Sequence, residues 1–305
     1  MELITIADFK HYTQTVDQRF SIDGAQINIP NNTIITNPII ILYEAPLIQE
    51  KYHITPQNHI VIGNNSKVNI IEIYLNKQQS IFSTKAQTII QVQDNAQLSY
   101  TILQQANTAD QQNLIVQIQQ QTDSQVNSQI FSYGGKINQI TLQATIAGYN
   151  ATCNIHALGY SKQTENHYLN LQIIHTHSAS TSAVNIRSVL DDHAKCSVHG
   201  KILVARNAPK IKANLQHKTI LLSEHAEIES KPQLEIYNDD VICTHGSSIG
   251  ELDLNALLYM NTRGISTIEA KQLLLQGFIA PNIDVVQCTN FRQQIKQLFC
   301  PEVFT

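Results

Sequence analysis

The stretch NDDVICTHGSSIG, from Asn238 to Gly250, gathers side chains that can do chemistry. It contains two acids, a cysteine and a histidine, and Cys243 and His245 are two positions apart. In an extended strand, residues at that spacing point to the same face. A thiol beside an imidazole can be a metal-ligand pair or a catalytic pair, because a neighbouring histidine can lower the thiol pKa. It can equally be a packing pair, and these residues alone leave both interpretations open.

Other histidines and cysteines carry weaker signals. His175 and His177 would share one face of a strand and could hold a first-row metal, but we favour solvent-facing positions in a strand ladder. The five cysteines have no CxxC spacing, which argues against a disulfide framework and a structural zinc site. The remaining four are expected to be packing residues: Cys153, Cys196, Cys288 and Cys300.

The composition argues against several classes of function. Charged residues make up 14% of the chain and the net charge is -4, so no broad basic face should attract nucleic acid. Aromatic residues are 6%, without tryptophan, which disfavours base-stacking platforms. The phosphate-loop, dinucleotide, nucleophile-elbow and HExxH motifs are all absent from the sequence. We therefore do not expect an enzyme of these classes.

The sequence also bears on location. The longest apolar run, PIIILY from Pro38 to Tyr43, is too short to span a bilayer. The first residues, MELITIADFK, include acids and lack the apolar segment of a secretory signal. Scattered thiols suit a reducing compartment. We expect a cytoplasmic protein that does not bind a membrane.

Alternating apolar and polar residues recur between polar turns along the chain, which predicts short strands. Strands of this kind would hold Cys243 and His245. The apolar residues just after successive turns are Val68, Leu98, Val126, Cys153 and Val184, with separations of 30, 28, 27 and 31. Further along, Cys196, Ile211, Ile228 and Ile242 are 15, 17 and 14 apart, about half that period. Two strands per coil plus corners would produce both spacings.

A β-sandwich is the alternative, but the sequence lacks Asn-Gly or Asp-Gly hairpin turns after the one at Asp23–Gly24. We therefore predict a mainly β fold, a parallel β-helix over residues 56–250, with residues 1–55 as a short segment leading into it. Stacked coils with ladders of Asn, Gln, Ser and Thr would explain the low charge.

Residues 251–305 change to helical spacing and predict a small C-terminal α-helical domain. Gly264 marks the end of a first helix. Ser266 and Glu269 form a capping-box pattern for a second helix, which Gly277 is expected to end. A third helix is expected over residues 288–300, before Pro301.

The stretch KPQLEIYNDDVICTHGSSIGELDLNALLYMNTRGISTIEAKQLLLQGF, from Lys231 to Phe278, resembles the C-terminal signature of the SufB/SufD family of iron–sulfur cluster assembly proteins. The similarity includes KPxLEI, the DDVxCxHG segment with Cys243 and His245, GxLD and RGI. With the upstream segments HTHSASTS and LLSEHAEIESKP, it covers at least residues 170 to 280. Gly246, in place of glutamate after the histidine, resembles the SufD side of the family.

The resemblance implies a right-handed parallel β-helix with a C-terminal helical domain, in agreement with the strand pattern. SSIG replaces the usual ATVG, which is a mild departure. The family's long N-terminal helical region is mostly absent from this sequence, so whatever that region does in relatives is open here.

The same resemblance implies a scaffold subunit that is not an enzyme. It would form a heterodimer with a SufB-like protein and dock a SufC-like ABC-type ATPase, whose closure would rearrange the interface. His245, and more weakly Cys243, would be ligands for iron or a transient iron–sulfur cluster at that interface, with no stably bound cofactor. The expected partner-binding residues lie on the C-terminal helices: Leu254, Leu257, Leu258, Tyr259, Arg263, Gly264, Leu273, Leu274 and Phe278.

Two other functions remain as alternatives. A β-helix enzyme could use Asp239, Asp240 and His245 as acid–base residues. A homodimeric β-helix could act only as a structural or iron-storing adaptor, through edge-to-edge strand pairing.

Overall fold

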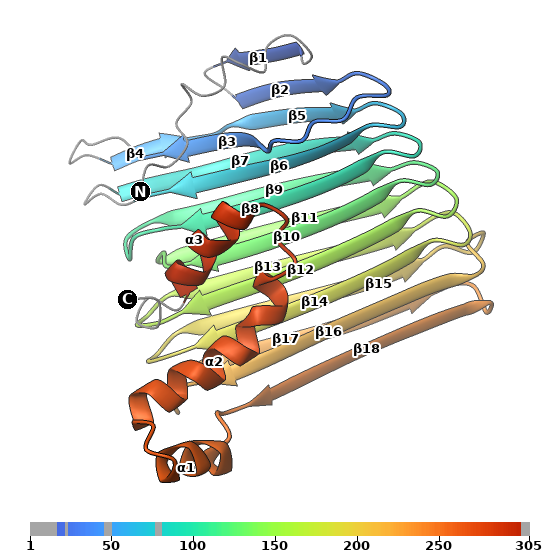
Figure 1. Cartoon of the computed structure of the whole chain (residues 1–305). Coiled ribbons are helices and arrows are strands. Elements are labelled where there is room, and N and C mark those ends of the chain that lie inside the picture. The colour runs from blue at the N-terminus through green and yellow to red at the C-terminus, as the bar shows by residue number, and fades with distance from the viewer. Residues whose placement is uncertain (1–16, 22–23, 46–50, 77–80, 300–305) are drawn as a thin grey trace.

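The computed structural model of the chain describes residues 17–21, 24–45, 51–76 and 81–299, and shows a parallel β-solenoid with three C-terminal helices (Figure 1). From β5 onward, successive strands alternate between two sheets, so each of these coils contributes one strand to each sheet. The predicted architecture, with two strands per coil, is confirmed.

We call one sheet the odd sheet, because its strands from β5 onward have odd numbers. Its order is β1-β2-β5-β7-β9-β11-β13-β15-β17, with β4 beside β7. Its strands are β1 (Asp17–Ser21), β2 (Gly24–Ile29), β4 (Lys51–Ile54), β5 (Gln57–Ile62), β7 (Ile81–Val92), β9 (Gln111–Gln120), β11 (Ile137–Ile146), β13 (Asn166–His175), β15 (Lys195–Val204) and β17 (Glu227–Ile236). All pairs are parallel except β1 with β2, where Ser21 pairs with Gly24. Asp23, in the predicted turn, lies outside the described residues.

We call the other sheet the even sheet, because its strands from β6 onward have even numbers. It is parallel, in the order β18-β16-β14-β12-β10-β8-β6-β3. Its strands are β3 (Ile39–Glu44), β6 (Lys67–Leu75), β8 (Gln97–Gln105), β10 (Gln125–Tyr133), β12 (Thr152–Ser161), β14 (Thr181–Leu190), β16 (Ile211–Leu221) and β18 (Val241–Gly250). β2 and β3, which precede residue 56, already pair with β5 and β6.

The strand register confirms most of the predicted coil-to-coil alignment. Val68 pairs with Leu98, Leu98 with Val126, and Val126 with Cys153. Cys153 then pairs with Ser182, and not with Val184 as predicted. The predicted register is wrong by two residues. Ser182 and Val184 point to the same face of the strand, so both registers fit the alternation of buried and exposed positions.

The alignment of the last coils was partly wrong. Cys196 pairs with Ile228, as predicted. Ile211 pairs with Val241, and not with Ile242. A shift of one residue moves a side chain to the opposite face, and Ile242 is indeed 65% exposed.

The corners that lead from the odd sheet to the even sheet contain a ladder of asparagines. Asn32, Asn65, Asn95 and Asn150 have positive φ angles, which asparagine adopts more readily than most residues. The Asn65 Nδ2 donates to Asn32 Oδ1 at 2.8 Å, and the Asn95 Nδ2 donates to Asn65 Oδ1 at 2.9 Å. Asn150 Nδ2 donates to Asp123 Oδ1 at 2.7 Å, so one acidic residue joins this otherwise uncharged ladder, which links successive coils.

The helices are α1 (Leu254–Thr262), α2 (Thr267–Ile283) and α3 (Thr289–Phe299). Figure 1 shows α2 and α3 lying across the even sheet, with α1 near the C-terminal coils. Apolar side chains of the sheet and of these two helices form one buried cluster, which includes Leu103, Phe131, Leu158, Val189, Ile279, Ile283, Phe291, Ile295 and Phe299. The outer face of the even sheet is therefore the surface that holds α2 and α3.

The predicted helix signals were partly right. Ser266 caps α2, since its Oγ accepts from the Glu269 N–H at 3.2 Å, and Gly264 follows α1 with a φ of 87°. Gly277, however, does not end α2, which continues through Pro281 to Ile283. Burial of Ile279 and Ile283 against the sheet favours this extension. Pro301 lies outside the described residues. In the part of the chain that is described, no helix has the length and apolarity to cross a membrane.

Candidate functional site at the open end of the solenoid

The last two strands, β17 and β18, form an open end of the solenoid. Among the residues that the structure describes, each is the terminal strand of its sheet and pairs on one side only, β17 with β15 and β18 with β16. Most side chains of β18 are exposed. Two unpaired strand edges therefore lie at the C-terminal end of the lumen, the interior between the two sheets.

The register of β18 places Cys243 and His245 on the face that continues the lumen. Cys243 pairs with Ala213, His245 with Leu215, and both of those partners are buried in the core. Cys243 is half-buried and packs against that core, whereas His245 is exposed at the open end. The spacing argument is thus consistent with the register.

The thiol of Cys243 differs from an activated nucleophile. Partial burial raises its pKa, and a hydrogen bond from the backbone of Ala213 opposes this only in part. The sequence allowed for a thiol pKa lowered by the neighbouring histidine, but the pKa of Cys243 is raised instead. The thiol is protonated at neutral pH and must lose its proton before it can bind a metal ion.

Polar side chains bridge the two strands beside this pair. The hydroxyls of Ser230 on β17 and Ser247 on β18 lie 2.8 Å apart, and Ser230 also contacts the buried His217 at 2.8 Å. Sequence reasoning missed this contact, because Ser230 and His217 are 13 residues apart and on different sheets.

No complete metal site is present within the described residues, since they contain no group of three or more His, Cys, Asp or Glu side chains placed to hold a metal ion. Cys243 and His245 supply two ligands at most. A tetrahedral iron or cluster site needs further ligands, which the described residues at this end of the solenoid do not supply.

The acid–base alternative is not supported by the geometry. Asp239 and Asp240 lie on an exposed corner before β18, whereas His245 lies in the middle of the strand. Five extended residues separate Asp240 from His245 by about 16 Å. Direct proton transfer between them would need hydrogen-bonding distance.

The other predicted histidine pair does not form an exposed ladder. His175 is buried, and its ring nitrogens lie 2.8 Å from Ser180 Oγ and 2.9 Å from Ser182 Oγ. Burial lowers the pKa of His175 to about 4. His177 lies in the following turn. The prediction that both face solvent was wrong for His175, because the strand ends there and its side chain packs between the sheets.

The cysteines outside the open end are in packing positions where they can be described. Cys153 is fully buried in the core, and Cys196 packs against it. Cys288 packs against the cluster between the helices and the even sheet. Cys300 lies outside the described residues.

The predicted partner-binding residues divide between surface and core. Leu254, Leu258 and Tyr259 of α1 are exposed, together with Ile268 of α2, which the sequence analysis did not select. We name these four residues the α1 patch. The Arg263 guanidinium lies 5.2 Å from the centre of the Tyr259 ring, and Gly264 is exposed.

The remaining residues of that set lie closer to the solenoid. Leu257 is buried and Leu274 is half-buried, whereas Leu273 is 37% exposed. Phe278 packs against the sheet, with its ring 5.0 Å from the Arg187 guanidinium, and its carbonyl oxygen accepts a hydrogen bond from Arg187. It therefore serves to dock α2 on the sheet.

Comparison with known proteins gives one family. The family described as "SUF system FeS cluster assembly, SufBD core domain" matches residues 47–278. The iron–sulfur cluster assembly protein SufD of Escherichia coli K12 is 25% identical over 239 residues, which cover 78% of this chain and 56% of that protein.

Two further relatives have similar sequence identities to this chain. The iron–sulfur cluster assembly SufBD family protein slr0076 of Synechocystis is 25% identical over 286 residues, covering 90% of this chain and 62% of that protein. The SufD protein of Bacillus subtilis is 26% identical over 284 residues, covering 89% and 62%. The matched region is thus less than two thirds of the length of these relatives.

Proposed function

This chain belongs to the SufBD core family of SUF-system iron–sulfur cluster assembly proteins, and we propose that it is a SufD-like subunit of a cytoplasmic assembly scaffold. In this scaffold its open end pairs with a SufB-like protein, and its helices dock a SufC-like ATPase. The observation that carries the proposal is the position of His245 on the lumen-facing side of a terminal strand with an unpaired edge.

Strand pairing at the open end supports the heterodimer. An unpaired strand edge presents N–H and C=O groups that readily bond to another strand. Ile236, Tyr237, Ile242 and Ile249 are exposed on or beside β17 and β18, and their apolar surface would be removed from water by a partner. A SufB-like solenoid end with the same architecture would supply a matching pair of edges.

Ligand chemistry at the interface supports a role in iron entry or cluster ligation. A neutral imidazole from His245 and a thiolate from Cys243 are both suitable for iron. Because they make only two ligands, the partner would supply the others. Pairing of the two ends would also exclude water from the site, which would protect a nascent cluster.

The α1 patch supports docking of the ATPase. Its exposed apolar side chains lie away from the buried cluster under α2 and α3. Asn282 of α2 donates hydrogen bonds to the carbonyl oxygens of Ala157 and Asn185, at 2.7 and 3.0 Å. This attachment would transmit movement of the docked ATPase to the even sheet, whose last strand carries His245.

The test is co-expression with the SufB-like and SufC-like proteins of the same genome, followed by anaerobic purification and mass determination. We expect a complex that contains all three chains. His245→Ala should leave that complex intact and abolish cluster loading, measured by iron content and absorbance. His177→Ala, a change at a turn histidine, is the matched control and should load normally.

Other results would reject parts of this proposal. Normal cluster loading by the His245→Ala complex would show that His245 is not a ligand. Purification of this chain without either partner, as a dimer of itself, would favour the homodimeric adaptor. Double replacement of Leu254 and Leu258 by Ser should release the ATPase only, and retention of the ATPase would reject the α1 patch as its docking site.

A further inference from the structure

The lumen is not uniformly apolar, because two polar columns face each other inside it. On the even sheet, the register aligns Gln104, Ser132, Gly159, Ser188 and Thr219. On the odd sheet it aligns Thr84, Gln112, Asn138, His167 and Cys196. Most of these residues are buried. Buried polar groups require hydrogen-bond partners, from protein or from ordered water.

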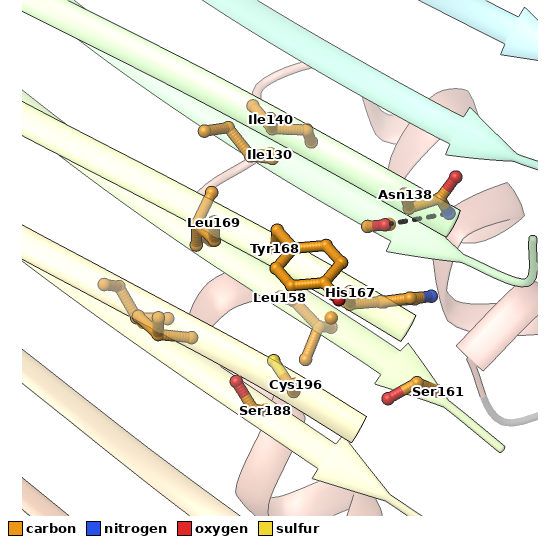
Figure 2. Close-up of a pocket in the computed structure, with 15 residues that line it drawn as sticks. Ile130, Asn138, Ile140, Leu158, Ser161, His167, Tyr168, Leu169, Ser188 and Cys196 are labelled. Atoms are coloured by element: carbon orange, nitrogen blue, oxygen red, sulfur yellow. Dashed lines mark hydrogen bonds between the residues drawn. The ribbon is translucent and has the colours of Figure 1, made fainter. Parts of the chain in front are cut away.

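A cavity of about 30 Å³ lies between these columns (Figure 2). Its lining is mostly apolar, from residues such as Ile130, Leu158 and Ile186, and its polar members include Asn138, His167 and Ser188, with the thiol of Cys196. The cavity exists beside Gly159 because that position has no side chain: a methyl group built there would meet only the Nδ1 of His167, at 3.9 Å. A volume of this size accommodates about two water molecules if enough polar partners are available.

Two acceptors in the cavity lining suit water. The His167 Nε2 lies 3.0 Å from the carbonyl oxygen of Gly134, which can only accept, so Nε2 carries the proton. Burial lowers the pKa of His167 to about 4, so at neutral pH the opposite nitrogen, Nδ1, is an acceptor. The Oδ1 of Asn138, whose residue is 1% exposed, has no hydrogen-bond partner among the described residues. Water can donate to both atoms.

A chain of hydrogen bonds leads from the cavity to the open end. Ser188 Oγ, in the cavity lining, lies 3.0 Å from His217 Nε2. His217 Nδ1 lies 2.8 Å from Ser230 Oγ, which lies 2.8 Å from Ser247 Oγ on β18. His217 is 1% exposed. Thr219 Oγ1 is a side branch, 3.1 Å from the same Nε2.

We propose that the cavity is a resident water site, and that Ser188, His217 and Ser230 form a proton relay between this water and the open end. A proton that reaches Ser230 displaces the hydroxyl proton onto His217 Nδ1. The Nε2 proton passes to Ser188, whose own proton passes to the cavity water, and this water passes a proton to the Nδ1 of His167. Each hydroxyl gains one proton and loses one, and the imidazole changes tautomer, so one proton moves and no redox partner is required.

This relay goes beyond the proposed function and does not depend on the identity of any partner. Its outermost member, Ser247, belongs to the strand that a docked solenoid would cover. A covered interface loses direct exchange with bulk water, so the relay would be the path that connects its protons with the cavity.

The relay is tested on the full chain with 15N-labelled histidine, by measuring how fast the ring N–H of His217 exchanges with solvent in NMR spectra. His175 is an internal reference, because its ring nitrogens contact Ser180 and Ser182, which do not line the cavity. We expect His217 to exchange about tenfold faster than His175, an effect comparable to one hydrogen bond.

Ser230→Ala should slow the exchange of His217 about tenfold and leave that of His175 unchanged, which also verifies folding. Ser197→Ala, on the outer face of β15, is the control and should change neither rate. Equal exchange of both histidines in the unaltered chain, or an unaffected His217 in Ser230→Ala, would overturn the relay.

The water site is tested separately by a high-resolution crystal structure of the chain. We expect water density within hydrogen-bonding distance of Asn138 Oδ1 and His167 Nδ1. Gly159→Ala should remove the water beside His167, since the added methyl group occupies that side of the cavity. Absence of density in the unaltered cavity would overturn the water site.

Discussion

The two ends of the solenoid contrast strongly. Near the N-terminal end, Glu72 is 1% exposed inside the lumen and accepts hydrogen bonds from Tyr74, Tyr100, Thr88 and Asn58. At the C-terminal end, His245 and Ser247 lie exposed on a strand with a free edge. Polar residues at the first end satisfy one another, whereas those at the second end are available to another molecule. Similar coils therefore form a buried polar network at one end and carry exposed polar side chains at the other.

The Glu72 network ties the first coils together. Its members lie on β5, β6, β7 and β8, and Tyr43 of β3 joins through a 2.6 Å hydrogen bond to Asn58. Burial raises the pKa of Glu72, while the hydrogen bonds from Tyr100, Tyr74, Thr88 and Asn58 lower it. The network is therefore costly to break, since its members have no solvent to replace a lost partner.

The largest effect is expected from Glu72→Ala, which removes the acceptor of the buried Tyr74 and Tyr100 hydroxyls and one of the two acceptors of the Asn58 amide. Removal of one member of such a network should lower the free energy of unfolding by about 3–5 kcal/mol. Urea unfolding monitored by circular dichroism measures this. Glu229→Ala, at an exposed carboxylate of the open end, is the control. An equal loss in both variants would remove the contrast between the ends.

A fall in pH should destabilise the region that contains the buried histidines more than the region around Glu72. Burial lowers the pKa of His167, His175 and His217 to about 4, below the usual value near 6.5, so these rings bind protons only after unfolding. Stability from each is fully present above pH 6.5 and is lost as the pH falls toward 4, by about 2 kcal/mol per histidine at pH 5.

Glu72 works in the other direction, because its raised pKa means that the folded state binds the proton more tightly, and stability falls as the pH rises through that value. Lowering the pH from 7.5 to 5 should therefore increase backbone hydrogen exchange in β13–β16 more than in β5–β8. Hydrogen exchange with mass spectrometry resolves the two regions. A uniform increase along the solenoid would contradict this prediction.

The smallest effect on stability is expected at the candidate site itself. His245→Ala removes an exposed side chain for which the structure shows no hydrogen bond among the described residues, so the free energy of unfolding should change by less than about 0.5 kcal/mol. Thermal and urea unfolding of the isolated chain measure this change. A loss above about 2 kcal/mol would mean that His245 stabilises the fold, and a defect in cluster loading could then not be assigned to ligation.

Part of the candidate site could be read from the sequence. The spacing of Cys243 and His245 in a strand pattern predicted a shared face, and strand period alone suffices for that. The helix cap at Ser266 was also predicted, because its hydrogen bond is local. The position of Phe278, by contrast, could not be predicted, since an amphipathic helix shows an apolar face without showing whether it packs on its own chain or on a partner.

The sequence by itself determined the coil period, the alternation between two sheets and the family, because each depends on local residue patterns. Only the tertiary structure decided which polar residues face the lumen and which end remains open. His217 and Ser230 are brought together by stacking of coils, and a register error of one or two residues, as at Ile242 or Val184, is enough to hide such a contact. Side-chain period in a strand repeats every two residues, so hydrophobicity identifies a face, whereas the lengths of the corners set the register.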